Sequence, residues 1–261
     1  MHPDILRLHQ VIEERHWWFV ARRKIITDVL DAVLPVDGTP VVLDLGCGTG
    51  GNIGELAATH ERWRCWGLEY DPDAVAYAAE TYPAAGFVCG SALDRSTWPA
   101  LDRVAACLLM DVIEHLEDDR TAVTNAAEAL SPGGHLLITV PADPRLWSKH
   151  DRHHGHFRRY TMDSLAAVLD GLPLERRVLT GFNARLYQPI RVWRGVQNNI
   201  PWLAERGTTG DMSVPPPLVN RPLTRLFAGE SRRILGSIDG PPAYERGVSL
   251  LAVYRRVTGG V

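Results

Sequence analysis

A glycine-rich turn at residues 43–51 carries the most informative chemistry in the sequence. The stretch Leu-Asp-Leu-Gly-Cys-Gly-Thr-Gly-Gly follows a short apolar run and precedes a helical pattern. Glycines at such a turn permit positive φ angles, and the missing Cβ lets a ligand approach the backbone. The ligand then meets unpaired N–H groups at the start of the helix. We expect Asp44, Gly46, Cys47 and Gly48 to contact that ligand.

An acidic residue completes this unit. Glu69 comes 18 residues after Gly51, at the end of a second predicted strand, where a carboxylate can accept hydrogen bonds from both ribose hydroxyls. The pattern therefore predicts a nucleoside site. Gly46, Gly48 and Gly51 also satisfy the G-x-G-x-x-G spacing, so an NAD-dependent oxidoreductase is an alternative. Asp44 argues against it, because a carboxylate there would repel a pyrophosphate but can hold an ammonium group through water.

A histidine-rich segment at residues 145–160 is the second group of interest. It holds four histidines and five Arg or Lys residues, and Asp151 is its one acid. A metal site, a base or anion-binding site, and a solvated loop are all compatible with this composition. The H-x₂-H-H-x-H spacing has no helical periodicity, so we expect no metal and favour contact with a substrate. The candidate catalytic residues in this segment are His150, His154, His156 and Tyr160. His115, which follows the fourth predicted strand, is a further candidate.

Aromatic and basic side chains cluster near the N-terminus. Trp17, Trp18, Phe19 and Arg22 lie on a predicted helix, and Trp18 and Arg22 share a face because they are four residues apart. One interpretation is a lid over the ligand, with Arg22 pairing to a carboxylate. The other is a helix that packs through tryptophan and extends its arginine to solvent. The sequence leaves both open. His115 is likewise either a catalytic base or a residue that orders its loop.

These groups need elements to position them. Periodicity predicts a helix over residues 4–34, ended by Pro35 and Gly38. From residue 40 to 141, short apolar strands alternate with helices of about ten residues, which indicates right-handed βαβ units and a parallel sheet. Further helices are predicted over 183–206, broken by Pro189 and Pro201, and over 220–237. A final strand is predicted over 247–257.

Composition narrows the class of protein. The chain has 261 residues, 45% of them hydrophobic, and a formal net charge of -3, so nothing global attracts it to nucleic acid or an anionic membrane. The four cysteines form no C-x-x-C pair, which favours free thiols over a disulfide framework. We see no signal peptide and no apolar stretch near the roughly 20 residues that span a bilayer. The expected location is the cytoplasm.

The sequence resembles the class I S-adenosylmethionine (SAM)-dependent methyltransferase family. DLGCGTGG at 44–51 resembles its first motif, MDVIEHLED at 110–118 its segment after the fourth strand, and LSPGGHLLITVP at 130–141 its entry to the fifth. HWWFVARRKII at 16–26 and HDRHHGHFRRYT at 150–161 resemble a bacterial subgroup within it. The resemblance implies an α/β, Rossmann-like fold with a mostly parallel seven-stranded sheet, helices on both faces, an N-terminal helix and a C-terminal helical cap.

The resemblance also implies which residues bind SAM. Many members place an aspartate after the third strand to hold the adenine amine, but here Ser91 stands at that position and offers no charge. Tyr70 stacks beside the adenine or is a plain surface or core aromatic. The cofactor-binding candidates are Trp18, Arg22, Asp44, Gly46, Cys47, Gly48, Glu69, Tyr70, Ser91, Ala92, Met110 and Asp111.

The expected function is methyl transfer from SAM to a small-molecule acceptor, a natural product or a sugar- or lipid-linked intermediate, by in-line displacement with assistance from histidine. A lipid-linked glycan at a membrane surface, with peripheral contact through residues 186–203, is an alternative, as is a SAM-binding protein without catalysis. No nucleic-acid partner is expected. The expected division is an N-terminal lid at 1–38, a SAM-binding core at 39–182, an acceptor-side cap at 183–240 and a final strand at 241–261.

Overall fold

A seven-stranded sheet forms the centre of the computed structural model, which describes residues 3–199 and 213–257. The strand order is β3-β2-β1-β4-β5-β7-β6. Six strands run in the same direction, and β7, between β5 and β6, lies antiparallel to both. The strands are β1 Val41–Leu45, β2 Arg64–Glu69, β3 Gly86–Cys89, β4 Val104–Met110, β5 Leu130–Pro141, β6 Leu174–Phe182 and β7 Ser249–Arg256. This confirms the expected α/β fold with a mostly parallel sheet.

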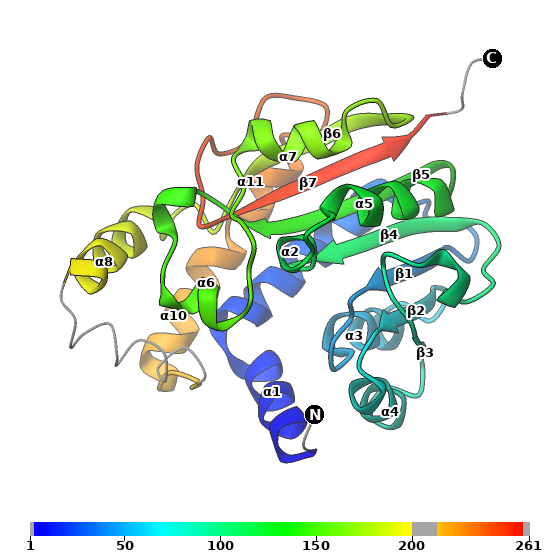
Figure 1. The fold of residues 1–261 in the computed structure, drawn as a ribbon, viewed down its shortest axis with the longest axis horizontal. Coiled ribbons are helices and arrows are strands. Elements are labelled where there is room, and N and C mark those ends of the chain that lie inside the picture. Colours follow the sequence, from blue (N-terminus) through cyan, green and yellow to red (C-terminus); the bar gives the residue numbers. More distant parts are fainter. Residues whose placement is uncertain (1–2, 200–212, 258–261) are drawn as a thin grey trace.

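Helices follow most of the strands and cover the sheet, as Figure 1 shows. The α-helices are α1 Pro3–Arg15, α2 Trp17–Val33, α3 Gly51–Thr59, α4 Pro72–Thr81, α5 Asp119–Ala129, α6 Lys149–His153, α7 Met162–Leu169, α8 Tyr187–Asn199, α10 Pro217–Ala228 and α11 Ser231–Leu235. Short 3₁₀ helices occupy Arg95–Thr97 (η1), Ile113–His115 (η2) and Pro144–Leu146 (η3). Within the described ranges, no helix is long and apolar enough to cross a membrane.

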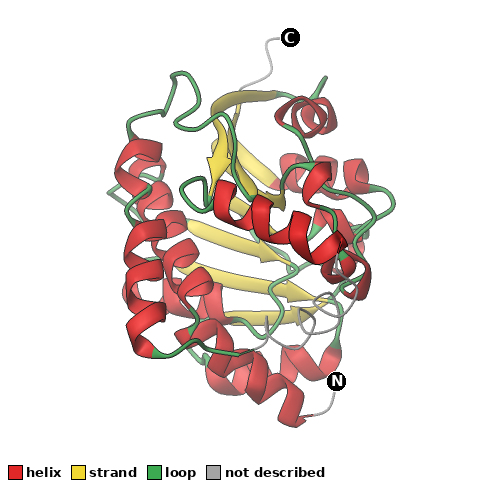
Figure 2. Ribbon diagram, turned by 90° about the vertical axis from the view of Figure 1, so that its left-hand side faces the viewer, coloured by secondary structure: helices red, strands yellow, loops and turns green. Residues whose placement is uncertain are grey.

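The core has two layers because side chains alternate across each strand. On β4, Leu108 packs into the cluster formed with α2, α3, α10 and α11, whereas Cys107 and Leu109 pack into the cluster formed with α5 and α7. Figure 2 shows helices on both sides of the strands. Strands buried on both faces explain why the sequence shows continuous apolar runs there. All four cysteines are free thiols.

The single N-terminal helix predicted over residues 4–34 is wrong. The chain breaks at His16, whose ψ of 132° is extended and whose ring accepts a hydrogen bond from the Trp18 amide. Asn220 of α10 explains how the break is tolerated: its side chain accepts from the Trp17 amide at 2.8 Å and donates to the Arg15 carbonyl at 2.7 Å. A residue 200 positions away thus replaces backbone hydrogen bonds that a continuous helix would make.

The C-terminal helices also differ from expectation. α8 begins at Tyr187, so Pro189 lies in its first turn, where a missing N–H costs little. The predicted break at Pro201 lies outside the described residues. The helix predicted over 220–237 is two helices, α10 and α11, because the chain turns at Gly229. The buried Glu230 holds this turn by accepting a hydrogen bond from the Arg185 amide at 2.9 Å.

Helix α2 is packed into the main core, and seven of its residues are buried. Its apolar face lies against α10 and α11, which come from the other end of the chain. Figure 1 shows these blue and orange helices side by side. The division of the chain at residues 38, 182 and 240 stays a prediction.

A substitution at Phe227 of α10 measures how much the C-terminal helices contribute to the stability of the fold. Its ring is fully buried and makes edge contacts with Trp17 and Phe182. Replacing it with alanine removes a large buried side chain and leaves a cavity, so we expect Phe227→Ala to lower the free energy of unfolding by about 3–5 kcal/mol. Urea unfolding followed by circular dichroism measures this. The neighbouring Leu226→Ala, at a partly exposed position, is the control and should cost under about 1 kcal/mol.

Candidate active site

The glycine turn lies where β1 ends and α3 begins, as expected. Gly46, Gly48 and Gly50 have φ angles of +77°, +57° and +83°, which glycine adopts without strain. A Cβ on Gly50 would lie 2.9 Å from the ring of Phe87, so packing alone requires glycine there. A Cβ on Gly48 would meet nothing within 4 Å. Gly48 therefore borders open space, where a ligand can approach.

The turn's amides are largely satisfied within the protein. The amides of Gly46 and Cys47 both donate to the Leu68 carbonyl, at 2.7 and 3.0 Å. The Gly50 amide donates to the Cys47 carbonyl at 3.0 Å. These three amides precede α3 and fix the turn against β2, so they are not free for a ligand. The expectation that a ligand meets unpaired N–H groups at the start of the helix stays a prediction.

Glu69 lies at the end of β2 beside the turn, as predicted, and is buried. Its carboxylate accepts from the Gly48 amide at 2.9 Å through one oxygen. The other oxygen accepts from the amides of Tyr70 and Asp71, at 2.9 and 3.1 Å. An ionised carboxylate can accept about four hydrogen bonds, so Glu69 keeps capacity for a further donor. It orders the turn and remains able to receive a hydroxyl.

Asp44 is the most unusual group of the site. Alternation along β1 directs it to the face that packs on α2 and α3, opposite to Leu43 and Leu45. It is 1% exposed, and neither carboxylate oxygen has a hydrogen-bond partner among the described residues. Burial raises its pKa to about 7, while the charge of Arg22 opposes the rise. An unpaired buried carboxylate is costly, and a cationic ligand group would relieve that cost.

Arg22 supplies the positive charge that faces these carboxylates. It is buried, forms an ion pair with Asp111, and its guanidinium lies 4.3 Å from the ring centroid of Trp18 and 5.4 Å from that of Phe19. The structure thus brings Trp18, Arg22 and Asp111 together at the end of β4. The Nε of Arg22 has no hydrogen-bond partner within the described chain. The interpretation in which Arg22 extends to solvent is therefore wrong, whereas a pairing of its spare Nε with a ligand carboxylate stays a prediction.

Glu13 was missed by the sequence analysis. It lies on α1 and its carboxylate accepts from the Thr49 hydroxyl at 2.7 Å. The backbone carbonyl of Glu13 accepts from Arg23, which also pairs with Glu55 of α3. Helix α1 thereby reaches the glycine turn through a polar contact. An acid on the polar face of an amphipathic helix gives no sequence signal for such a contact.

The remaining cofactor candidates surround the same strand ends. Met110 is buried at the end of β4, and Cys47 is buried within the turn. Tyr70 is 78% exposed beside Glu69, so its ring is open to stacking. The Ser91 hydroxyl accepts from the Leu93 amide at 3.2 Å, and the Ala92 carbonyl accepts from Asn125 at 3.0 Å. The loop after β3 is therefore ordered by its own contacts.

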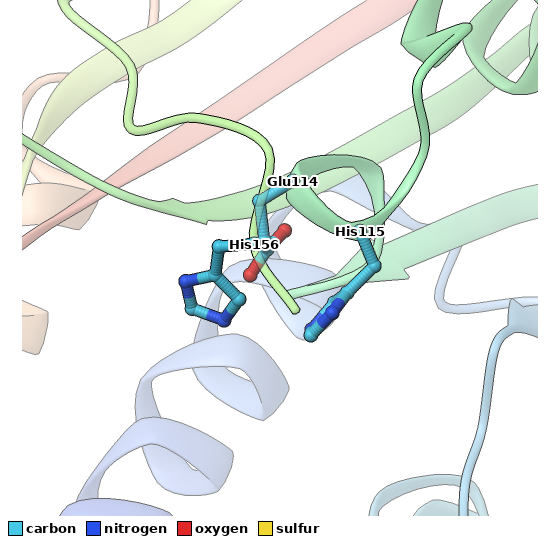
Figure 3. A group of neighbouring side chains, drawn as sticks. All are labelled: Glu114, His115 and His156. Carbon is cyan, nitrogen blue, oxygen red and sulfur yellow. The ribbon is translucent and has the colours of Figure 1, made fainter. Parts of the chain in front are cut away.

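Two of the predicted catalytic histidines lie together. His115 of η2 and His156 of the loop after α6 are in edge contact, with ring centroids 4.6 Å apart. Glu114 lies beside them, and Figure 3 shows its carboxylate between the two rings. Burial lowers the pKa of His115, and the charge of His156 adds to the effect. Burial raises the pKa of Glu114 well above its usual range, and Asp111 raises it further.

The other predicted catalytic residues are placed differently. Tyr160 is buried, and its hydroxyl donates to Asp119 at 2.7 Å and to the Ile113 carbonyl at 3.3 Å. Burial, with Asp119, raises its pKa, so this hydroxyl stays protonated and serves the packing of the loop. His154 is exposed, with its ring centroid 6.2 Å from that of His156. The side chain of His150 lies outside the described part of the structure.

Asp151 anchors the histidine-rich segment. Its fully buried carboxylate accepts from Arg159 at 2.7 Å, from the Ser148 amide at 2.8 Å, and contacts Nδ1 of His156 at 3.1 Å. Burial alone would raise its pKa, but the His156 hydrogen bond and the Arg159 charge hold it well below the usual range. The Phe157 amide donates to the Glu114 carbonyl at 2.7 Å. These contacts fix His156 beside η2.

Part of the chain is similar to known proteins. Residues 43–138 match the family described as a methyltransferase domain. The chain is 33% identical over 124 residues to an uncharacterized 37.1 kDa protein in transposon TN4556 of Streptomyces fradiae, covering 46% of this chain and 34% of that protein. It is 28% identical over 123 residues to an O-methyltransferase of Pyrenophora dematioidea, covering 46% of this chain and 45% of that protein. The matches span less than half of either relative.

The fold recurs in solved structures. The plantazolicin methyltransferase BamL, in complex with a triazolic desmethylPZN analog and S-adenosylhomocysteine (SAH), superposes with a TM-score of 0.55 at 11% identity, covering 98% of this chain and 92% of that one. At this identity the likeness shows the fold alone. Residues 43–138 therefore match a methyltransferase domain, and the chain shares the Rossmann-like fold of a methyltransferase solved with SAH, the product form of SAM. The finer subgroup suggested by residues 16–26 stays a prediction.

Asp44 predicts a pH dependence of stability. Burial raises the pKa of Asp44 from its ordinary value of 3.8 to about 7, so the folded state disfavours the ionised form. Below pH 3.8, Asp44 is protonated in both the folded and the unfolded state and does not lower the free energy of unfolding. As the pH rises from 3.8 towards 7, the free energy of unfolding decreases, because only the unfolded state ionises readily. Relative to Asp44→Asn, the wild type should therefore lose about 2–3 kcal/mol between pH 5 and pH 8 in the absence of ligand. Urea unfolding at both pH values measures this, and an equal gap at both would contradict the burial of an unpaired carboxylate.

Proposed function

We propose that this protein transfers the methyl group of SAM to a small-molecule acceptor, a natural product or a sugar- or lipid-linked intermediate. The observation that carries the proposal is the buried, unpaired carboxylate of Asp44, on the strand that leads into the glycine turn. A cationic amino-acid group is what such a carboxylate lacks, and SAM carries one. The methyltransferase-domain match over residues 43–138 supports the same conclusion independently.

On the donor side, each proposed contact uses a group with spare capacity. Asp44 receives the ammonium group, directly or through water, and Glu69 receives a ribose hydroxyl. Arg22 offers its Nε to the carboxylate of the methionine part. When bound, SAM supplies a methyl group already activated by the sulfonium charge. The protein then needs to align the acceptor with the S–CH₃ bond and exclude water.

On the acceptor side, we place the substrate at the carboxyl end of β4. His115 and His156 lie there and can polarise the atom that receives the methyl group. Figure 1 shows α6 and α8 beyond the ends of β4 and β5, on this side of the sheet. Val192 and Trp193 of α8 are exposed apolar side chains. They suit the apolar part of an acceptor, and they favour a lipid-linked acceptor as the second candidate.

Gly48→Arg tests the donor site. The arginine side chain would fill the open space at the turn, so we expect at least a 100-fold loss of SAH affinity by calorimetry. The backbone strain of a positive φ costs about 1 kcal/mol, which leaves the fold intact. Gly38→Arg is the matched control, because Gly38 has a φ of +95° and open surroundings but lies before β1. Equal SAH affinity in Gly48→Arg and wild type would refute the placement of the cofactor.

Methyl transfer itself is tested with isotopically labelled SAM and a panel of hydroxylated small molecules and lipid-linked sugars. We expect label in one acceptor class. With that acceptor, His115→Ala and His156→Ala should lower kcat by about 100-fold while leaving SAH affinity within about twofold, since the histidines face the acceptor. His153→Ala, an exposed neighbour, should keep wild-type kcat. SAH binding without label transfer to any acceptor would instead favour a SAM-binding protein without catalysis.

A further inference from the structure

Glu114, His115 and His156 form a cluster that the methyl-transfer proposal does not fully use. One potential ligand atom from each side chain lies within 4.8 Å of the others. Atoms that bind one metal ion at about 2.0–2.2 Å lie at most about 4.4 Å apart, so small side-chain rotations bring these three to bonding distance. The cluster joins residues 41 positions apart in the sequence, from η2 and from the loop after α6.

Glu114 points independently to a ligand at this position. Its side chain is 1% exposed, and its Oε2 has no hydrogen-bond partner in the part of the chain that the structure describes. A buried carboxylate oxygen without a partner is costly, and a cation is the group that best relieves the cost. Figure 3 shows that the carboxylate lies between the two imidazole rings, where such an ion would contact all three side chains.

His156 is oriented in the way that metal-binding histidines are. Its Nδ1 contacts the fully buried carboxylate of Asp151, which Arg159 and Ser148 hold in place. A carboxylate behind the ring fixes its orientation and makes the opposite nitrogen a better ligand. His115 is exposed on the other side of the cluster, so an ion has a path from solvent. Three protein ligands would leave coordination positions open for water or another ligand.

We propose that Glu114, His115 and His156 bind one divalent transition-metal ion. Two imidazoles and one carboxylate favour Zn²⁺, Fe²⁺, Mn²⁺ or Co²⁺ over Mg²⁺ and Ca²⁺, which prefer oxygen ligands. Binding depends on these side chains and not on methyl transfer, so it stands independently of the proposed function. With the ion in place, the imidazoles serve as ligands, and the ion itself polarises an oxygen-bearing group beside it.

Titration of the full, tag-free chain with Co²⁺, followed by visible absorption, tests this proposal. We expect saturable binding of one ion per chain, displaced by Zn²⁺. His115→Ala should weaken binding by at least 100-fold, and because His115 is exposed, this variant should fold as the wild type does. Glu114→Gln, which keeps the side-chain shape, should weaken binding similarly. His153→Ala is the matched control within the histidine-rich segment and should bind as the wild type does.

The proposal is overturned if the wild type shows no saturable binding up to about 1 mM Co²⁺, or if His115→Ala binds as tightly as the wild type. Loss of binding in His153→Ala with retention in His115→Ala would place the ion elsewhere in the segment and also overturn it. SAH calorimetry on the same variants separates the two proposals. If only the metal proposal is wrong, the protein binds SAH normally but does not bind Co²⁺. If only the proposed SAM site is wrong, the protein binds Co²⁺ but does not bind SAH.

Discussion

Compensation of buried negative charge is the constraint on which this site depends. Asp44, Asp111 and Glu114 lie at the ends of adjacent strands, largely shielded from water, and Arg22 is the cation that faces them. The break at His16 lets α2 start where its first turns place Trp18 over the guanidinium. One arginine cannot satisfy three carboxylates, so Asp44 and Glu114 retain unpaired oxygens. Binding of a cationic group would relieve that imbalance.

Much of this architecture is predictable from the sequence. Strand ends, the glycine turn and Glu69 follow from local patterns, namely apolar runs, positive-φ glycines and a fixed spacing to the next strand. The helix boundaries at His16 and Gly229 are not, because contacts of Asn220 and Glu230 with distant backbone groups decide them. Helix propensity depends on residues that lie within one or two turns of each other. It therefore carries no information about a hydrogen-bond partner 200 positions away.

The candidate site divides in the same way. The positions of Asp44, Gly48, Glu69 and Asp111 were predictable because motif spacing places them at or beside neighbouring strand ends, and that of Arg22 because it shares a helix face with Trp18. Glu114 and the pairing of His115 with His156 were not, since long-range contacts bring η2 and the loop after α6 together, among them those of Phe157 with Glu114 and of Tyr160 with Ile113. Spacing inside the histidine-rich segment argued against a metal, but the proposed ligand set takes just one residue from that segment.

The Asn220 side chain, which spans the break between the first two helices, ties distant ends of the chain together. Both of its hydrogen bonds go to main-chain groups that no neighbouring residue serves. The helix that carries Glu13 towards the glycine turn is therefore held in part by α10. Removing the last fifth of the polypeptide would leave an amide and a carbonyl at the N-terminal joint without partners. The end of the molecule that carries the glycine turn consequently requires the C-terminal segment to be synthesised and docked before it is complete.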